Sequence, residues 1–436
     1  MITPAEKSPE ESVSLSRAFR LGLFQTGSAL TDLLTSGIWN RILISDLGAQ
    51  ATPVALLSAL KYLLAPLTLW IGYLSDHHRI FGRYRVPYIF IGRALVVVGT
   101  LLLPASVAGI AAGQFWGWIW GFVALLIAGV GTTASGAPFL ALVADTFPYQ
   151  RRGIAISIVE TFLIASFSLA PPILARFIPQ YEPDLFRDLA IGVAGLSSAF
   201  WLIALFRAEP RRESPPQQTE KPDFTGQFRA IFADPQARAY GVFVAVSAAF
   251  AFMQDALLEP FGGDVFGLSL GETTRFNAWW GVGVLSSMTV TAFKTRHFAP
   301  HQHKGLTGLG LAWMGITLAL LGLASQIQAL ILVRPLLFLF GLGFGLYGIG
   351  GYNLLMTVNR DDASGAYLAL WTVVQMLARG VGLLMGGVLR DAGYALSQSY
   401  ALAYALLFIL ESLGLFTAVI LLRRISFTRF IPQARD

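Results

Sequence analysis

Residues 129–155 read GVGTTASGAPFLALVADTFPYQRRGIA, and residues 341–367 read GLGFGLYGIGGYNLLMTVNRDDASGAY. In both stretches a glycine-rich apolar run leads into a short charged loop and then into a second run that opens with Gly and Ala. At a constant offset, four glycines of the first stretch fall on glycines of the second: Gly129, Gly131, Gly136 and Gly153 on Gly341, Gly343, Gly348 and Gly365. Close helix packing alone is a second explanation for small residues in apolar helices. The shared context favours an internal repeat, and therefore a chain of two related halves.

The composition around this repeat is that of a membrane protein. The chain is 55% hydrophobic and 13% charged, whereas soluble domains carry about 25% charged residues. Apolar runs of about 20 residues, long enough to span a bilayer as helices, occur in two sets of six. The first set lies near 20–44, 51–74, 87–108, 115–142, 153–175 and 189–207, and the second near 238–258, 273–293, 306–325, 330–356, 366–389 and 399–422.

The polar segments fix the predicted organisation and orientation. A hydrophilic linker, 209–236, separates an N-terminal half at 20–208 from a C-terminal half at 237–423, and the tails are 1–19 and 424–436. Most Lys and Arg residues fall on the side of the tails and the linker, which places both termini in the cytoplasm. Residues 1–20 lack the features of a signal peptide, so the first apolar run is expected to remain as an anchor.

Twelve helices in two six-helix halves, related by an axis along the membrane normal, are the architecture of the major facilitator superfamily. We therefore predict an all-α membrane protein of this fold. The loop after the second helix is similar to the signature loop of that superfamily, with Gly72, Asp76, and then Gly82 followed by Arg83 and Arg85. Its Asp-to-Gly spacing is three residues longer than in ordinary facilitator transporters, which argues against a generic sugar or drug carrier. A helix-ending Asp in a basic cytoplasmic loop is the structural alternative.

Three further stretches carry a narrower resemblance. They are RLGLFQTG at 20–27 followed by GIWNRILISDLG at 37–48, RVPYIFIG at 85–92, and ADTFPYQRRG at 144–153, which contains Asp145, Arg151 and Arg152. These motifs resemble those of the PucC family, also called the bacteriochlorophyll-delivery family. The resemblance implies a protein of photosynthetic membranes, thylakoid or intracytoplasmic, or of the plasma membrane, that assists the assembly of antenna or photosystem proteins. It also implies transient binding of chlorophyll or bacteriochlorophyll.

Ionisable side chains inside predicted spans are costly and usually face the bundle interior. Four of them are candidate substrate or coupling residues: Asp32, Lys61, Glu160 and Arg379. We expect Asp32 and Lys61 to form an interior ion pair. Such pairs serve either a substrate or proton site between the halves or a purely structural role.

A chlorophyll-type ring requires an axial ligand for its magnesium and an apolar wall. All five histidines fall in predicted loops, so amide side chains or water remain as ligands within the membrane. The candidates are Gln25, Asn40, Asn277, Asn353 and Gln375, although such residues more often join helices by hydrogen bonds. Trp279 and Trp280 are candidates for a flat surface that holds a pigment or a partner helix, with lipid-facing packing as the alternative.

Other site chemistries find little support in the sequence. The chain contains no Cys, which excludes thiolate chemistry. The His297, His301 and His303 group is interrupted by Pro300, so we expect a solvated loop and no metal site. No nucleotide or hydrolase motif stands in a suitable context, so we expect no enzyme. The alternative functions are a proton-coupled carrier of a small solute on the same fold, or a scaffold that binds partners without pigment.

Overall fold

The computed structural model describes residues 9–148, 151–209, 229, 233–295, 300–358 and 364–425. These residues form helices and contain no β-strand beyond an isolated bridge between Ile80 and Arg83. The helices of the first half are α1 (Pro9–Asp32), α2 (Trp39–Arg41), α3 (Ala51–Leu63), α4 (Ala65–His77), α5 (Val86–Ala111), α6 (Phe115–Thr146), α7 (Arg152–Phe177) and α8 (Pro183–Leu205). Those of the second half are α10 (Pro235–Ala251), α11 (Leu258–Phe266), α12 (Leu270–Thr274), α13 (Phe276–Lys294), α14 (Pro300–Gln326), α15 (Leu330–Val358), α16 (Ser364–Ser397) and α17 (Tyr400–Arg423).

The apolar runs of the sequence coincide with the long helices. Among the described residues, 9 helices are long and apolar enough to cross a membrane. The runs at 20–44, 238–258 and 273–293 yield helices that are interrupted or less apolar, and they are not among these 9. The protein is therefore a multi-pass membrane protein, and the count of twelve spans stays a prediction.

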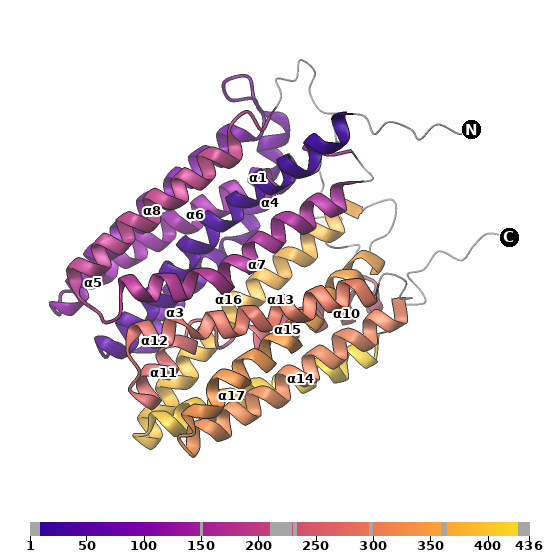
Figure 1. The fold of residues 1–436 in the computed structure, drawn as a ribbon. Helices are drawn as coiled ribbons and strands as arrows, with labels where there is room; N and C mark the ends of the chain where they lie inside the picture. Colours follow the sequence, from indigo (N-terminus) through magenta and orange to yellow (C-terminus); the bar gives the residue numbers. More distant parts are fainter. Residues whose placement is uncertain are drawn as a thin grey trace, which may run out of the picture.

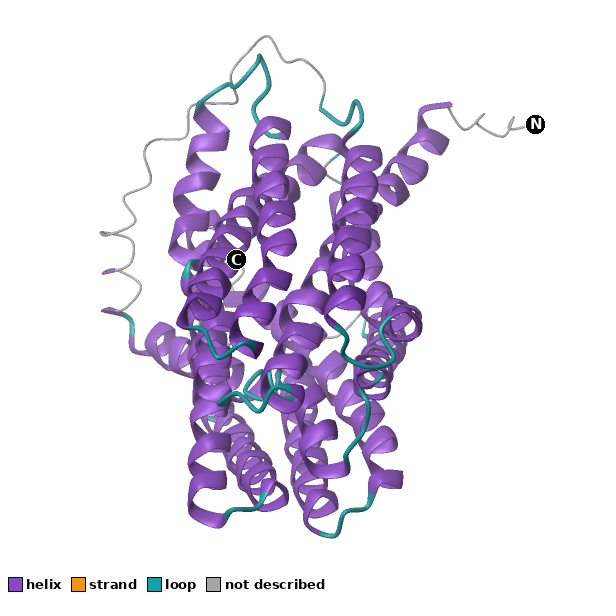
Figure 2. Cartoon of the chain, turned by 90° about the vertical axis from the view of Figure 1, so that its left-hand side faces the viewer, coloured by secondary structure: helices purple, strands orange, loops and turns teal. Residues whose placement is uncertain are grey.

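The helices form two groups that lie side by side (Figure 1). Helices α1 and α4 to α8 pack mainly with helices of the first half, and most of α10 to α17 pack mainly with helices of the second half. The two groups meet where α3 packs against α16 and α7 packs against α13. Seen from another side in Figure 2, the bundle consists of long helices, and the loops that the structure describes between them are short. We call the end where α1 begins and α17 ends the terminal end, and the opposite end, which holds α11 and α12, the distal end (Figure 1).

Equivalent glycines of the internal repeat make equivalent helix contacts. A Cβ atom on Gly131 of α6 would lie 2.9 Å from the backbone nitrogen of Val96 on α5. A Cβ atom on Gly343 of α15 would lie 3.0 Å from the backbone nitrogen of Met314 on α14. In each half, glycine therefore lets the fourth predicted span touch the third.

The neighbouring glycine pairs show the same correspondence. Gly129 faces the Lys61 backbone on α3, and Gly341 faces Val284 on α13, so each lets the fourth span approach the second. Gly136 and Gly348 both face open space. Because the two members of each of the three pairs have equivalent surroundings, the repeat detected in the sequence extends to the packing of the helices.

The helix predicted at 20–44 is longer and less regular than expected. Helix α1 begins at Pro9, and two π-helical segments, η1 (Leu33–Ile38) and η2 (Ile42–Asp46), continue it on either side of α2. Single π turns inside α-helices occur mostly at functional sites. The first of them starts directly after Asp32.

The continuous helix predicted at 238–258 is wrong. Helix α10 ends at Ala251 and α11 begins at Leu258, with an unwound segment between them. Local bonds, from Leu257 N–H to the Gln254 carbonyl at 2.8 Å and from Asp255 N–H to the Phe252 carbonyl at 3.2 Å, satisfy part of the freed backbone. An unwound segment at this depth is tolerated where it is enclosed by protein. We call Phe252–Leu257 the α10–α11 break.

The solvated loop predicted around His301 and His303 is also wrong. Helix α14 begins at Pro300 and not near residue 306, so both histidines lie in its first turns, and His303 is 8% exposed. Proline suits the first turn of a helix because its missing N–H has no partner there in any case. His297 lies outside the described residues.

Candidate functional site

An ion pair lies beside the first irregular segment. The Lys61 Nζ on α3 is 3.0 Å from the Asp32 carboxylate at the end of α1, and it also donates to the Ser36 hydroxyl at 3.0 Å. The side chains of Lys61 and Asp32 are 16% and 39% exposed, so the pair is reached from a cavity and is not sealed in the core. The ion pair expected from the sequence is therefore present.

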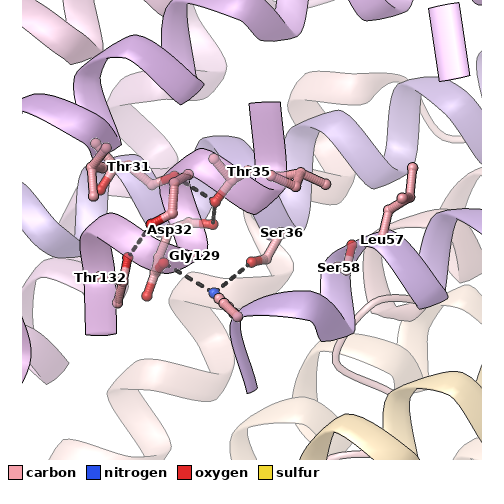
Figure 3. A pocket seen from close by; sticks show the side chains of 12 residues that line it. Thr31, Asp32, Thr35, Ser36, Leu57, Ser58, Gly129 and Thr132 are labelled. Carbon is pink, nitrogen blue, oxygen red and sulfur yellow. Dashed lines mark hydrogen bonds and ion pairs between the residues drawn. The ribbon is translucent and has the colours of Figure 1, made fainter. Parts of the chain in front are cut away.

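The cavity beside this pair is small, and its walls combine hydroxyl and charged side chains with apolar ones (Figure 3). Five helical elements of the first half, α1, η1, α3, α5 and α6, provide its walls. Its lining residues are Thr31, Asp32, Thr35, Ser36, Leu57, Ser58, Lys61, Val96, Leu125, Ala128, Gly129 and Thr132. Hydroxyl groups around a charged pair suit water or a small polar solute better than a large flat ring.

A second ion pair lies in the C-terminal half, at the α10–α11 break. The Arg379 guanidinium on α16 is 2.5 Å from the Asp255 carboxylate. The Phe252 ring lies 3.9 Å from the Arg379 Cζ atom, as a cation–π contact. Interrupted membrane helices next to charged groups are a recurring element of transporter binding sites.

The ring of Tyr62 joins the two ion pairs. The Arg379 Cζ atom lies 4.4 Å from the centre of this ring, and the Lys61 Nζ atom lies 5.1 Å from it. Asp32 and Asp255 also interact electrostatically with the cation of the opposite half. We call Asp32, Lys61, Tyr62, Asp255 and Arg379 the charged junction. Two cations and two carboxylates meet there, so the junction is balanced in charge.

Aromatic rings extend from the charged junction across the face between the halves. Phe252 contacts Phe344 of α15 at 5.2 Å, Phe344 contacts Trp280 of α13 at 5.3 Å, and Trp280 contacts Phe167 of α7 at 6.3 Å between ring centres. All four rings remain partly exposed, unlike the fully buried rings of the core. We call Phe167, Trp280, Phe344 and Phe252 the aromatic arc.

The two tryptophans singled out in the sequence have different surroundings. Trp280 belongs to the aromatic arc, whereas its neighbour Trp279 is 43% exposed. Adjacent residues on a helix point about 100° apart, so they cannot share one face. Only Trp280 is therefore part of the surface between the halves.

Glu160 forms a separate polar contact. The Gln25 side chain of α1 donates to the Glu160 carboxylate of α7 at 3.0 Å. Tyr352 of α15, in the other half, is 55% exposed and interacts electrostatically with Glu160. The structure therefore places this carboxylate near both halves, but it brings Glu160 into no contact with the charged junction.

The amide candidates differ in how far they are engaged. Asn40 is fully used, because its nitrogen donates to the Ser36 carbonyl and its oxygen accepts from Ser58 at 2.8 Å. Asn277 donates to Glu259 at 2.7 Å, and Asn353 donates to the Ile349 carbonyl at 2.9 Å.

Gln375 is the exception among these amides. It has no hydrogen bond within the described part of the chain and is partly exposed. It lies one helical turn before Arg379, on the same side of α16. Its amide oxygen is therefore free to bind a magnesium ion or another ligand beside the charged junction.

The loop motif after α4 organises the terminal end around Arg85. Its guanidinium pairs with Asp76, lies 3.6 Å from the Asp145 carboxylate of α6 and donates to the Ser75 hydroxyl at 3.0 Å. Gly72 faces α6, where an added Cβ atom would lie 3.9 Å from that of Ala137.

The added length of this loop forms a tight turn. Ile80 and Arg83 pair as an isolated bridge, and Phe81 and Gly82 between them have φ values of 51° and 75°. The extra residues therefore lengthen the loop and leave the Asp76–Arg85 pair intact. In the separate stretch at 144–153, the Arg152 side chain at the start of α7 donates to the Phe147 carbonyl at 3.3 Å, and Arg151 is the N-cap residue of that helix.

A third set of contacts joins the halves at the distal end. The Asp391 carboxylate of α16 accepts hydrogen bonds from the backbone N–H groups of Ala51 at 2.9 Å and Thr52 at 2.7 Å, at the start of α3. Arg390 pairs with Asp264 of α11 at 2.5 Å. The Asp391 carboxylate therefore caps α3 from the opposite half and joins the two halves at the distal end.

Sequence reasoning missed Tyr62, Phe252, Asp255 and Phe344. Asp255 carried a usable signal, because it is an acidic residue inside the apolar run at 238–258, like the four ionisable residues that were selected. The aromatic residues carried none, since phenylalanine and tyrosine are common throughout the spans.

The helices have the major facilitator fold. The interior between the two halves is charged and aromatic. A solved structure of a bacterial homologue of the human lysosomal transporter Spinster, inward-facing and unoccupied, matches with a TM-score of 0.71 and 15% identity over 98% of this chain and 100% of that one. A match at this identity shows the fold alone.

The family model described as PUCC protein matches residues 38–430 of this chain, so the chain belongs to the PucC family. Protein PucC of Rhodobacter capsulatus is 27% identical over 94% of this chain and 92% of its own length. Protein PucC of Cereibacter sphaeroides is 28% identical over 92% of this chain and 91% of its own length.

Proposed function

We propose that this protein assists the assembly of light-harvesting or photosystem complexes by transiently holding chlorophyll or bacteriochlorophyll between its two halves. Membership of the PucC family supports a role in a photosynthetic membrane. The observation that carries the pigment proposal is the aromatic arc, which ends at Arg379 and Tyr62.

The chemistry of the arc suits a tetrapyrrole. A flat conjugated ring binds well to partly exposed aromatic faces, and its carbonyl substituents accept hydrogen bonds from a guanidinium. Gln375 offers an unengaged amide oxygen to the magnesium ion of the pigment, which accepts hard oxygen ligands. The cavity at Asp32 lies outside the arc, and its small size and charged pair do not suit the ring.

The proposed role has no catalytic step. The protein would accept pigment, shield it from water and release it to an antenna or photosystem polypeptide. The termini would face the cytoplasm, in accordance with the distribution of Lys and Arg.

Adjacent tryptophans provide a matched test of the pigment proposal. The protein and its variants Trp280→Leu and Trp279→Leu are purified in mild detergent from a pigmented photosynthetic host. We expect Trp280→Leu to lower the pigment absorbance per mole of protein at least several-fold, and Trp279→Leu to leave it near that of the unmodified protein.

Two outcomes would refute pigment binding at the arc. One is a purified protein without pigment, and the other is equal pigment loss in both variants. Antenna proteins that co-purify with a pigment-free protein would instead support the scaffold function.

The charged cavity in the N-terminal half favours a second function, proton-coupled transport of a small solute. Asp32 and Lys61 line a space of suitable polarity. This function predicts uptake of a solute into vesicles that is abolished by Asp32→Asn and unaffected by Trp280→Leu. Uptake that responds to neither variant, or no uptake of any solute tested, would count against it.

A further inference from the structure

Glu411 is a carboxyl group in the core of the C-terminal half, and the described residues provide it with no counterion. It lies in the middle of α17 and is 0% exposed. Neither of its oxygens receives a well-formed hydrogen bond from the described residues. The backbone of Gln254 lies beside it, and Asp255 is close enough to repel it.

A third buried oxygen in the same region also lacks a donor. Gln254 is 3% exposed, and its side-chain oxygen has no hydrogen-bond partner in the described part of the chain. Its side-chain nitrogen donates to the Ala251 carbonyl at 3.4 Å. Glu411 and its neighbour Gln254 therefore contribute three buried oxygens that accept no well-formed hydrogen bond from the described residues. Unsatisfied buried acceptors are unfavourable, and a bound proton would supply the missing donor.

No cation compensates Glu411 among the described residues. Helix α17 packs against α10, α11, α14 and α16. Asp255 of the α10–α11 break repels Glu411 and pairs with Arg379 of α16. Arg390 of α16 pairs with Asp264 of α11 and with Asp391. Glu259 of α11 accepts from Thr274 and Asn277, and Arg238 of α10 is exposed. On α14, Lys304 is bonded to the Arg423 and Ile425 carbonyls at the terminal end.

The tyrosine that α17 contributes does not compensate Glu411 either. The Tyr404 hydroxyl donates to Asp264 at 2.9 Å. An ionised carboxylate buried without a partner is strongly unfavourable, and a neutral carboxylic acid is the accessible alternative.

We propose that Glu411 is a proton-binding site whose occupancy is set by the Asp255–Arg379 ion pair. With the pair closed, Arg379 is committed to Asp255 and Glu411 retains its proton, so the three groups together are neutral. When Asp255 no longer holds Arg379, the guanidinium becomes available as a counterion and Glu411 releases its proton. A ligand that engages the charged junction would in this way exchange a proton with the C-terminal half.

Infrared difference spectroscopy tests the site without pigment or partner. The protein in lipid nanodiscs near neutral pH is compared with Glu411→Gln, and with Glu182→Gln as a control at an exposed glutamate. We expect Glu411→Gln to remove a carbonyl stretch of a protonated carboxyl, and the control to remove only bands of an ionised carboxylate. If Glu411→Gln removes an ionised-carboxylate band instead, the site is refuted.

Two further variants keep the test decisive. If Glu411→Gln does not fold, Glu411→Asp must shift the protonated-carboxyl band, and an unshifted band refutes the site. Asp255→Asn frees Arg379 and should diminish the band of protonated Glu411. An unchanged band would refute the proposal that the Asp255–Arg379 pair sets the protonation of Glu411. Since no pigment is present, failure here is distinct from failure of the pigment proposal.

Discussion

The guanidinium of Arg379 lies over the ring of Tyr62, with its Cζ atom 4.4 Å from the ring centre, although the two residues belong to opposite halves of the protein. Arg379 is at the same time paired with Asp255, and Tyr62 also faces the Lys61 ammonium. A movement of one half against the other must therefore disturb the contact between Arg379 and the Tyr62 ring, which links the two ion pairs. This coupling makes the charged junction the place where a bound ligand would influence the arrangement of the halves.

The Asp32–Lys61 pair is expected to stabilise the fold. The contribution should lie between the value for an exposed pair, about 0.2–1 kcal/mol, and that for removing one partner of a buried pair, about 3–5 kcal/mol. Lys61→Met should therefore lower the thermal unfolding temperature measured in detergent. Disrupting the exposed Asp184–Arg187 pair, with side chains 81% and 56% exposed, by Asp184→Asn is the control and should change it little. Equal effects of both variants would contradict a structural role for the interior pair.

Asp391 is expected to hold the distal end closed by capping α3. Asp391→Ala removes an acceptor for two backbone N–H groups, and loss of a helix cap costs about 0.5–2 kcal/mol. Hydrogen exchange at Ala51 and Thr52 should accelerate in the variant. Unchanged exchange at these amides would show that the cap does not control opening of this end.

The glycines of the repeat predict a pair of opposite outcomes. Gly131→Ala places a methyl group against the α5 backbone and should destabilise the protein by about 1–3 kcal/mol, the usual cost of overpacking. Gly136→Ala adds its methyl group to open space and should be neutral or slightly stabilising, because alanine favours helix. Thermal unfolding of the two variants compares them directly, and a greater loss with Gly136→Ala would contradict the packing described.

Arg85 and Arg83 belong to one loop motif but should differ in importance. Arg85 contacts Asp76, Asp145 and Ser75, whereas the Arg83 side chain has no partner in the described part of the chain. Arg85→Ala should lower the unfolding temperature and increase proteolysis of the loop, and Arg83→Ala should do neither. A similar loss in both variants would show that positive charge alone explains the motif.

Glu272 at the distal end gives a pH dependence. Hydrogen bonds from the Ser269 backbone and hydroxyl lower the pKa of this carboxyl below its ordinary value. A lowered pKa in the folded state means stability that is present above the ordinary pKa and is lost as the pH falls through the lowered one. The protection of α12 amides, measured as exchange relative to the intrinsic rate at each pH, should therefore fall on acidification below about pH 4, and Glu272→Gln should remove that dependence. A pH response that persists in the variant would assign it to another group.

Much of the fold could be predicted from local sequence. Long apolar runs, polar linkers and repeated glycines specify where helices begin, end and touch, because lipid demands that each span satisfy its own backbone groups. The Asp32–Lys61 pair was also accessible, since two opposite charges in neighbouring spans have little alternative to each other. The α10–α11 break was not, because the run at 238–258 is apolar enough for a continuous helix.

The sequence by itself therefore determined the class of this protein: an all-helical membrane protein with an internal repeat and motifs of the PucC family. Only the tertiary structure decided that Arg379 meets Tyr62 and Asp255, that Trp280 and not Trp279 joins the aromatic arc, and that Asp391 caps α3. These partners are distant in the chain or differ only in which way they point. Helix periodicity is a local property of the sequence, whereas the meeting of side chains from different helices depends on how whole helices pack together.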